Sequence, residues 1–211
     1  KHNVAIGIMA GGVSTAGSGN IFVGCYSGYC NGGGSTNVYL SRKAGYFNKT
    51  GHDNVMIGDC AGFCGSDQGC NIFIGKEAGY CNCGDHNIGI GFKAGQKIQT
   101  GTCNIFMGPQ TGMCASTGSN NIGFGFQVLS LANLTGDNNI ALGHYTGRRI
   151  ATGAGNIFLG SGAGRYVLGG HQNIGIGLGA QYCLSGGHCN VAIGPNAGSR
   201  QTTSDNNTSI G

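Results

Sequence analysis

The sequence has few charged side chains, almost no proline, no tryptophan and no long apolar run. Lys, Arg, Asp and Glu make up only 9% of the 211 residues and the formal net charge is +4, which indicates neither charge-driven disorder nor the basic patch that nucleic-acid binding needs. The 2 prolines exclude a collagen-type helix, although 46 residues are glycine. Apolar runs of only a few residues predict no membrane insertion. A glycine-rich, weakly charged chain of this kind is typical of a repeat protein.

One short segment recurs along the whole chain: Asn, then Val or Ile, any residue, an apolar residue and Gly. It begins at Asn3, Asn20, Asn37, Asn54, Asn71, Asn87, Asn104, Asn121, Asn139, Asn156, Asn173, Asn190 and Asn207. The spacing is 17 residues, with one interval of 16 ending at Asn87 and one of 18 ending at Asn139. We therefore expect a single repeat domain over residues 1–211. Because both ends fall within the pattern, we also expect it to be a segment of a longer fibre chain.

The repeat has the features of a short strand followed by sharp corners. Counting from the Asn as zero, positions +1 and +3 are apolar, and the β-branched residues at +1 favour a strand. Gly at +4 and +8 allows the chain to turn there. A unit this short cannot bury its own apolar side chains, whereas stacked turns with strands about 4.8 Å apart can. The sequence therefore predicts an all-β fold, a β-solenoid or β-roll of about twelve 17-residue turns that is on the order of 60 Å tall.

Position +2 carries no charged, Asn or Gln side chain, although it points away from the face that +1 and +3 share. A strand that is apolar on both faces is buried on both, and soluble monomers avoid an exposed apolar column of this length. We therefore predict a parallel homotrimer with position +2 at the interface. The largest side chains of this predicted interface are Phe22, Tyr39, Met56, Phe73, Phe106 and Phe158. The alternative is a wide single-chain coil that packs position +2 inside.

The recurring asparagine is interpreted as structural. Stacked turn over turn, its side-chain amide can form a ladder and satisfy backbone groups at the corner. The asparagines expected in this ladder include Asn20, Asn37, Asn54, Asn71, Asn104 and Asn156.

Eleven cysteines occur, most of them at positions +10 and +16. If these two positions lie side by side across the glycine turn near +14, disulfides become possible, and they would indicate an oxidising, extracellular location. The predicted pairs are Cys103 with Cys114, Cys183 with Cys189, and Cys70 with either Cys64 or Cys81. The alternative is that cysteine fills tight corners as a small apolar residue. No Cys-x-x-Cys pair is present, so the spacing of structural zinc sites is missing.

No catalytic residue, metal site or cofactor is predicted. Histidines recur at +15, as in His171 and His188, where we interpret them as solvent-facing rather than metal-binding. The carboxylates are scattered over separate turns, which does not support a general acid–base pair. Aromatic side chains at +9, such as Tyr46 and Tyr80, are interpreted as packing on neighbouring turns, with a carbohydrate-contacting ladder as the alternative.

Two repeats carry a family resemblance. Residues 71–80 (NIFIGKEAGY) and 156–165 (NIFLGSGAGR) resemble the repeats of virion structural and tail-fibre proteins of marine bacteriophages, notably cyanophages. They are also similar to the β-roll repeats of trimeric autotransporter adhesin heads. The resemblance covers residues 3–211. The longer period and the many cysteines depart from the adhesin pattern and favour the phage resemblance.

The resemblance implies a homotrimeric, elongated fibre without enzymatic activity, located outside the cell at a virion or cell surface. The partners it implies are other copies of the chain, other fibre or virion proteins, and a host surface receptor or glycan. Nucleic acid and membrane insertion are not expected. The alternative function is that of a bacterial surface adhesin or an extracellular filament subunit.

Overall fold

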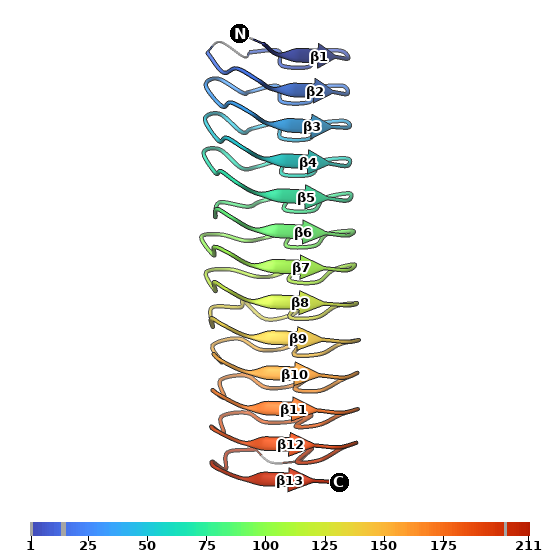
Figure 1. The fold of residues 1–211 in the computed structure, drawn as a ribbon, viewed down its shortest axis with the longest axis vertical. Helices are drawn as coiled ribbons and strands as arrows, with labels where there is room; N and C mark the ends of the chain where they lie inside the picture. The colour runs from blue at the N-terminus through green and yellow to red at the C-terminus, as the bar shows by residue number, and fades with distance from the viewer. Residues whose placement is uncertain (1, 14–15, 201) are drawn as a thin grey trace.

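A computed structural model describes residues 2–13, 16–200 and 202–211 of the chain. These residues form a β-solenoid of about 12 turns with the two termini at opposite ends (Figure 1). The predicted all-β solenoid is thus confirmed. The thirteen three-residue strands are β1 Val4–Ile6, β2 Ile21–Val23, β3 Val38–Leu40, β4 Val55–Ile57, β5 Ile72–Ile74, β6 Ile88–Ile90, β7 Ile105–Met107, β8 Ile122–Phe124, β9 Ile140–Leu142, β10 Ile157–Leu159, β11 Ile174–Ile176, β12 Val191–Ile193 and β13 Thr208–Ile210.

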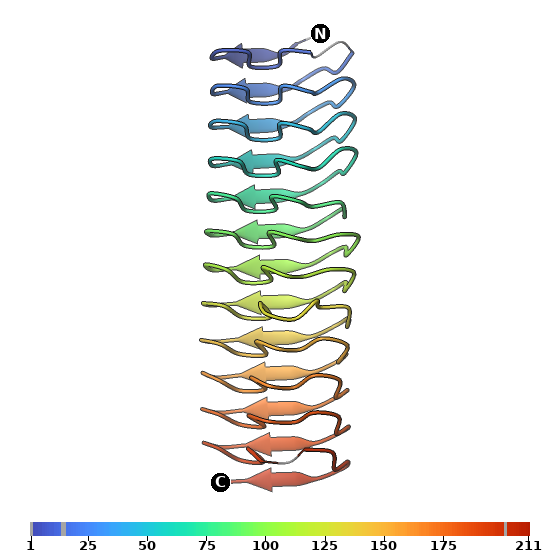
Figure 2. The same ribbon diagram turned by 180° about the vertical axis from the view of Figure 1, so that it is seen from behind.

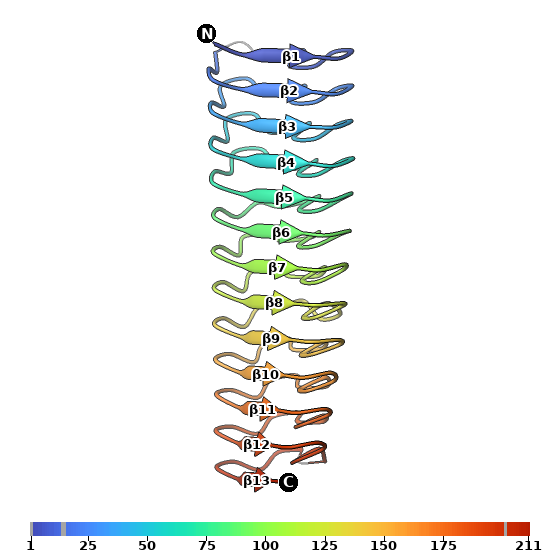
Figure 3. The same ribbon diagram turned by 45° about the vertical axis from the view of Figure 1, so that its right-hand side comes forward.

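All strands lie in one parallel sheet, and their order in the sheet follows the chain. The register pairs equivalent positions, as in Ile105 with Ile122. It is kept across the repeats of irregular length, because Ile72 still pairs with Ile88 and Ile122 with Ile140. Viewed from the side, the sheet runs the full length of one face of the column (Figure 3). The extra or missing residue is therefore absorbed outside the strands.

Each strand ends at a corner that is glycine in every turn except one, where Ser41 follows β3 with φ 110°. Gly108 follows β7 with φ 121°, a backbone conformation that residues with a side chain rarely adopt. The segment that returns to the next strand runs along the opposite side of the turn (Figure 2). It also bonds to its neighbour, since the Gly95 N–H donates to the Thr111 carbonyl at 2.9 Å and the Gly112 N–H to the Val128 carbonyl at 2.9 Å. Backbone hydrogen bonds thus join successive turns on both sides of the solenoid.

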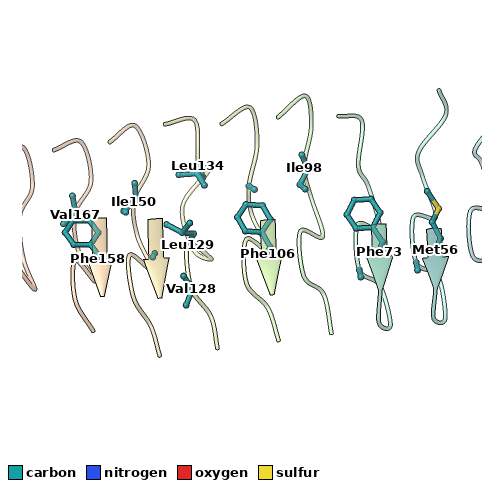
Figure 4. Close-up of a cluster of buried hydrophobic side chains, with 14 of the residues drawn as sticks. Met56, Phe73, Ile98, Phe106, Val128, Leu129, Leu134, Ile150, Phe158 and Val167 are labelled. Carbon is teal, nitrogen blue, oxygen red and sulfur yellow. The ribbon is translucent and has the colours of Figure 1, made fainter. Parts of the chain in front are cut away.

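The side chain at +2 of each strand points into the chain's own coil, where the largest ones lie in single file (Figure 4). Those of the predicted trimer interface are no more than 2% exposed in the single chain: Phe22, Tyr39, Met56, Phe73, Phe106 and Phe158. The prediction that this column meets partner chains is therefore wrong, and the alternative coil that packs +2 inside is correct. The return segment covers the inner face of the sheet, so positions +1 and +3, which we expected inside, face outward.

The interior is filled by complementary volumes within each turn. A side chain on Gly112, at +8, would place its Cβ 2.4 Å from the Phe106 ring, so a large residue at +2 requires glycine there. Where +2 is small, another position supplies the volume. In the turn that has Gly89 at +2, for example, Ile98 at +11 is fully buried. The packing density expected of a protein core is thus kept although position +2 varies from Gly to Tyr.

The close stacking of turns leads to a first prediction, for Gly101→Ala. The added Cβ would lie 2.3 Å from the Gly118 carbonyl oxygen of the next turn and 3.0 Å from Asn104 Nδ2. Because backbone atoms cannot give way cheaply, we expect a loss of about 2 kcal/mol in the free energy of unfolding, measured by urea denaturation. The matched control is Gly186→Ala, whose Cβ would have no neighbour within 4 Å and should change stability little. Equal stability of the two variants would contradict this account of the stacking.

Candidate interaction face

The outward side of the sheet is an apolar face, formed by positions +1 and +3 of all thirteen strands. Every residue at these positions is Val, Ile, Leu, Met or Phe except Thr208. Exposure is large for several of them: Ile6 is 61% exposed, Phe124 51% and Ile193 41%. At +1, Ile105 is half-buried by the side chains stacked above and below it. We call these two columns the apolar face.

The apolar face is larger than the apolar patches that soluble monomers usually expose. Its 25 apolar side chains are all at least partly exposed, whereas the largest apolar patch of a typical soluble monomer covers only about 300–600 Å². It extends over all thirteen strands, and a standard stable interface needs only roughly 800 Å² from each partner. Side chains at +5 extend it at the corner, with Phe92 41% and Leu178 60% exposed. Its area is therefore sufficient for stable association.

The apolar face contains a shallow hollow of about 420 Å³. The residues that line it are Ile90, Met107, Gly108, Pro109, Phe124, Gly125 and Phe126. All seven are apolar or glycine, so the hollow offers no charge or side-chain hydrogen-bonding group to a small polar ligand. Its shape suits an apolar side chain of another protein.

The recurring asparagines form a continuous ladder beside the sheet, and each is fully buried except near the ends. Asn104 shows the pattern. Its Oδ1 accepts the Asn121 N–H at 2.9 Å, while its Nδ2 donates to the Gly118 carbonyl at 2.9 Å and to Asn87 Oδ1 at 3.1 Å. The ladder thus satisfies backbone groups that the short strands leave unpaired. The same buried arrangement includes Asn20, Asn37, Asn54, Asn71 and Asn156.

All eleven cysteines are free thiols in the structure, so none of the predicted disulfides is formed. This applies to Cys64, Cys70, Cys81, Cys103, Cys114, Cys183 and Cys189. Cys64 and Cys81, at equivalent positions on adjacent turns, share a side-chain hydrogen bond. Burial and a hydrogen bond with Cys81 raise the pKa of the Cys64 thiol to about 12, which disfavours its reactive thiolate. Pairing across the glycine turn stays a prediction.

The aromatic residues at +9 stack on one another along one edge of the shaft. The ring centroids of Tyr29, Tyr46, Phe63 and Tyr80 are separated by 5.2, 5.2 and 5.1 Å in succession. The planes of these neighbouring rings are within 24° of parallel. Because the faces within the stack cover one another, few are free to stack on a sugar. The arrangement favours packing between turns over a carbohydrate-contacting ladder.

A second cluster near the C-terminal end combines arginine with tyrosine. Arg165 lies over Tyr145, Tyr166 and Tyr182, with its guanidinium carbon 4.8, 5.4 and 5.8 Å from their ring centroids. Arg148 lies 4.5 Å from the Tyr145 centroid. The sequence contains no Asp or Glu between residues 138 and 204, so no acidic side chain of that segment neutralises these cations. The cluster can attract an anionic group.

The histidines at +15 of two adjacent turns stack on one another. The rings of His171 and His188 lie 5.2 Å apart and within 10° of parallel. His188 Nδ1 accepts the His171 backbone N–H at 3.2 Å, and His171 Nδ1 accepts the Ala154 N–H at 3.1 Å. Both rings are thus engaged with the backbone. No helix that could span a membrane occurs in the described part of the chain.

Sequence reasoning missed the apolar face because it assigned the wrong side of the strand to the interior. The signal was present in the pairing of large residues at +2 with glycine at +8, which places the two positions in contact. We compared the chain with known protein families, with curated proteins and with solved structures, and found no match in any of the three. The functional conclusions therefore depend on the geometry of the chain itself.

Proposed function

We propose that this chain is a structural shaft: an elongated, parallel homotrimeric β-solenoid of a virion fibre that supports attachment to a host. The observation that carries the proposal is the apolar face, which runs the length of the solenoid without a charged residue. Such a surface is stable in water only when it is covered. A second copy of the same face is the partner whose length and chemistry fit it best.

A threefold arrangement suits the shape of the face. The two columns at +1 and +3 lie about 7 Å apart, two residues along each strand, so three copies can turn these narrow strips toward one axis and enclose the side chains. Parallel alignment keeps equivalent turns at the same height, which matches the constant register of the sheet. Hollows such as the one beside Phe124 then receive side chains from a neighbouring copy. The oligomer thus uses the apolar face in place of the buried +2 column.

An extended scaffold role also agrees with the rest of the surface. Because the geometry repeats regularly from turn to turn, the solenoid would hold an attached module at a fixed distance from the virion. A bacterial surface adhesin or extracellular filament is the second candidate. The cluster of Arg148, Arg165 and Tyr145 favours it, because cations and rings of this kind suit acidic surface glycans.

The oligomer is tested by light scattering after size-exclusion chromatography. We expect a mass of three times 21.3 kDa that survives reductant. Ile105→Asp places a carboxylate in the centre of the apolar face and should weaken association at least about 100-fold without unfolding the chain. The control is Thr100→Asp on an exposed corner, at a position where Asp67 occurs in another turn, and it should leave the mass unchanged.

Each other outcome is decisive. A wild-type mass of 21.3 kDa would overturn the oligomeric shaft, and a mass twice that value would overturn the threefold arrangement. If Ile105→Asp keeps the trimer, the apolar face is not the interface. Circular dichroism of the dissociated variant separates loss of association from loss of folding.

A further inference from the structure

Away from the apolar face, three metal-ligating side chains from adjacent turns come together. His52 and Asp53 directly precede Asn54, the ladder asparagine of one turn. Cys70 directly precedes Asn71, the ladder asparagine of the next turn. Asp53 and Cys70 therefore occupy the same position of the repeat, one above the other. One donor atom from each of the three side chains lies within 4.8 Å of the other two. Among the residues that the structure describes, this is the one group of three such donors.

The imidazole of His52 is oriented in a way that suits a ligand. Its Nδ1 lies 2.8 Å from Asp53 Oδ2, so an ion that replaced a proton on Nδ1 would lie between these two atoms and could bind both. The ring lies over Gly69 of the next turn, where an added Cβ would be 3.0 Å from its Cε1 and 3.2 Å from its Nε2. The missing side chain at Gly69 thus provides the room that the ring occupies. Sequence spacing alone did not indicate this arrangement.

The surroundings favour a cation. Two of the three donors, those of His52 and Cys70, line a hollow of about 140 Å³ together with Asp67, Gly69, Asp85 and His86. Two carboxylates and two imidazoles line it, and none of its lining residues is Lys or Arg. Asp85 Oδ1 accepts the Gly69 N–H at 2.8 Å, which holds that carboxylate at the edge of the hollow. The local field therefore attracts a positive ion.

We infer that His52, Asp53 and Cys70 form a binding site for a divalent transition metal ion of the zinc type. The mixed imidazole, carboxylate and thiolate donors suit Zn²⁺, whereas Ca²⁺ and Mg²⁺ prefer oxygen donors alone. Cys70 binds as the thiolate, so its Sγ–H bond breaks, an Sγ–metal bond forms and the proton passes to the solvent. With three protein ligands the fourth position is open to water or to His86. The ion would join two adjacent turns of the solenoid.

The site is tested on the full chain in a non-thiol reductant, with Co²⁺ as a spectroscopic probe and Zn²⁺ as competitor. We expect a thiolate-to-cobalt absorption band that Zn²⁺ removes. Cys70→Ser should abolish this band, and His52→Ala should weaken cobalt binding by about tenfold or more. The matched control is Cys189→Ser, an exposed thiol at the same repeat position whose Sγ contacts Gln172 Oε1. It should leave both the band and the affinity unchanged.

The design distinguishes this site from the other ten thiols. If Cys70→Ser retains the band, another cysteine binds the metal and the assignment is wrong. If His52→Ala binds cobalt as tightly as the wild type, the imidazole is not a ligand and the assignment is equally wrong. The His52 side chain is 59% accessible, and Cys70→Ser only exchanges sulfur for oxygen in a half-buried side chain, so both variants are expected to fold, which circular dichroism checks.

Discussion

Phe106→Asp is expected to unfold the central turns of the shaft, even in a single isolated chain. The Phe106 side chain is completely buried, and the ring fills the space that Gly112 and Gly123 leave open. Removal of the ring alone, as in Phe106→Ala, costs about 3–5 kcal/mol. A carboxylate in the same interior adds the cost of burying a charge without a partner. We therefore expect loss of the native circular dichroism spectrum and rapid proteolysis within the turns around β7.

The neighbouring variant makes this result informative. Ile105→Asp introduces the same charge one residue earlier, but on the apolar face, and should leave the chain folded while separating the copies. If Phe106→Asp instead gave a folded chain of reduced mass, position +2 would lie at a subunit interface. The two variants thus test which side of the strand faces the interior, one through loss of folding and the other through loss of association.

Asn104→Ala is expected to lower the free energy of unfolding by about 3 kcal/mol, because it leaves buried polar groups without partners. The Asn121 N–H loses its acceptor and the Gly118 carbonyl loses a donor, while no water can reach either group. Urea denaturation monitored by circular dichroism measures the loss.

Asn207→Ala is the matched control for the ladder. Asn207 is the last asparagine. Its Nδ2 donates to the exposed Asp205 carbonyl, which water can satisfy, and to Asn190 Oδ1, which still accepts the residue-207 backbone N–H in the variant. We expect a loss of no more than about 1 kcal/mol. A similar loss in both variants would mean that the asparagines act locally and not through the buried ladder.

Much of the fold could be predicted from the period alone. The strands begin at the residue after each recurring asparagine, and equivalent positions pair in register, because a regular repeat leaves one way to stack its turns. The side of the strand that faces inward could not be predicted from alternation, since +1, +2 and +3 are all apolar. It is decided by contacts within the turn, such as that between Phe106 and Gly112.

The candidate sites were less predictable for a related reason. Asp53 and Cys70 share one position of the repeat, but His52 reaches them only because Gly69 leaves the space beneath its ring. No spacing motif records a missing side chain in another turn. Similarly, the apolar face becomes a candidate interface only after the interior has been assigned.

The backbone hydrogen bonds between turns give the shaft an unusual mechanical response. Those bonds run along its long axis, so a pull on the two ends loads them along their length, and the outermost turn gives way first. Each turn that detaches releases 17 residues, or about 60 Å of extended chain at about 3.5 Å per residue, in place of one 4.8 Å layer. A single chain under tension would therefore lengthen in nearly equal steps. It would resist extension at low force and would extend by the unfolding of successive turns at high force.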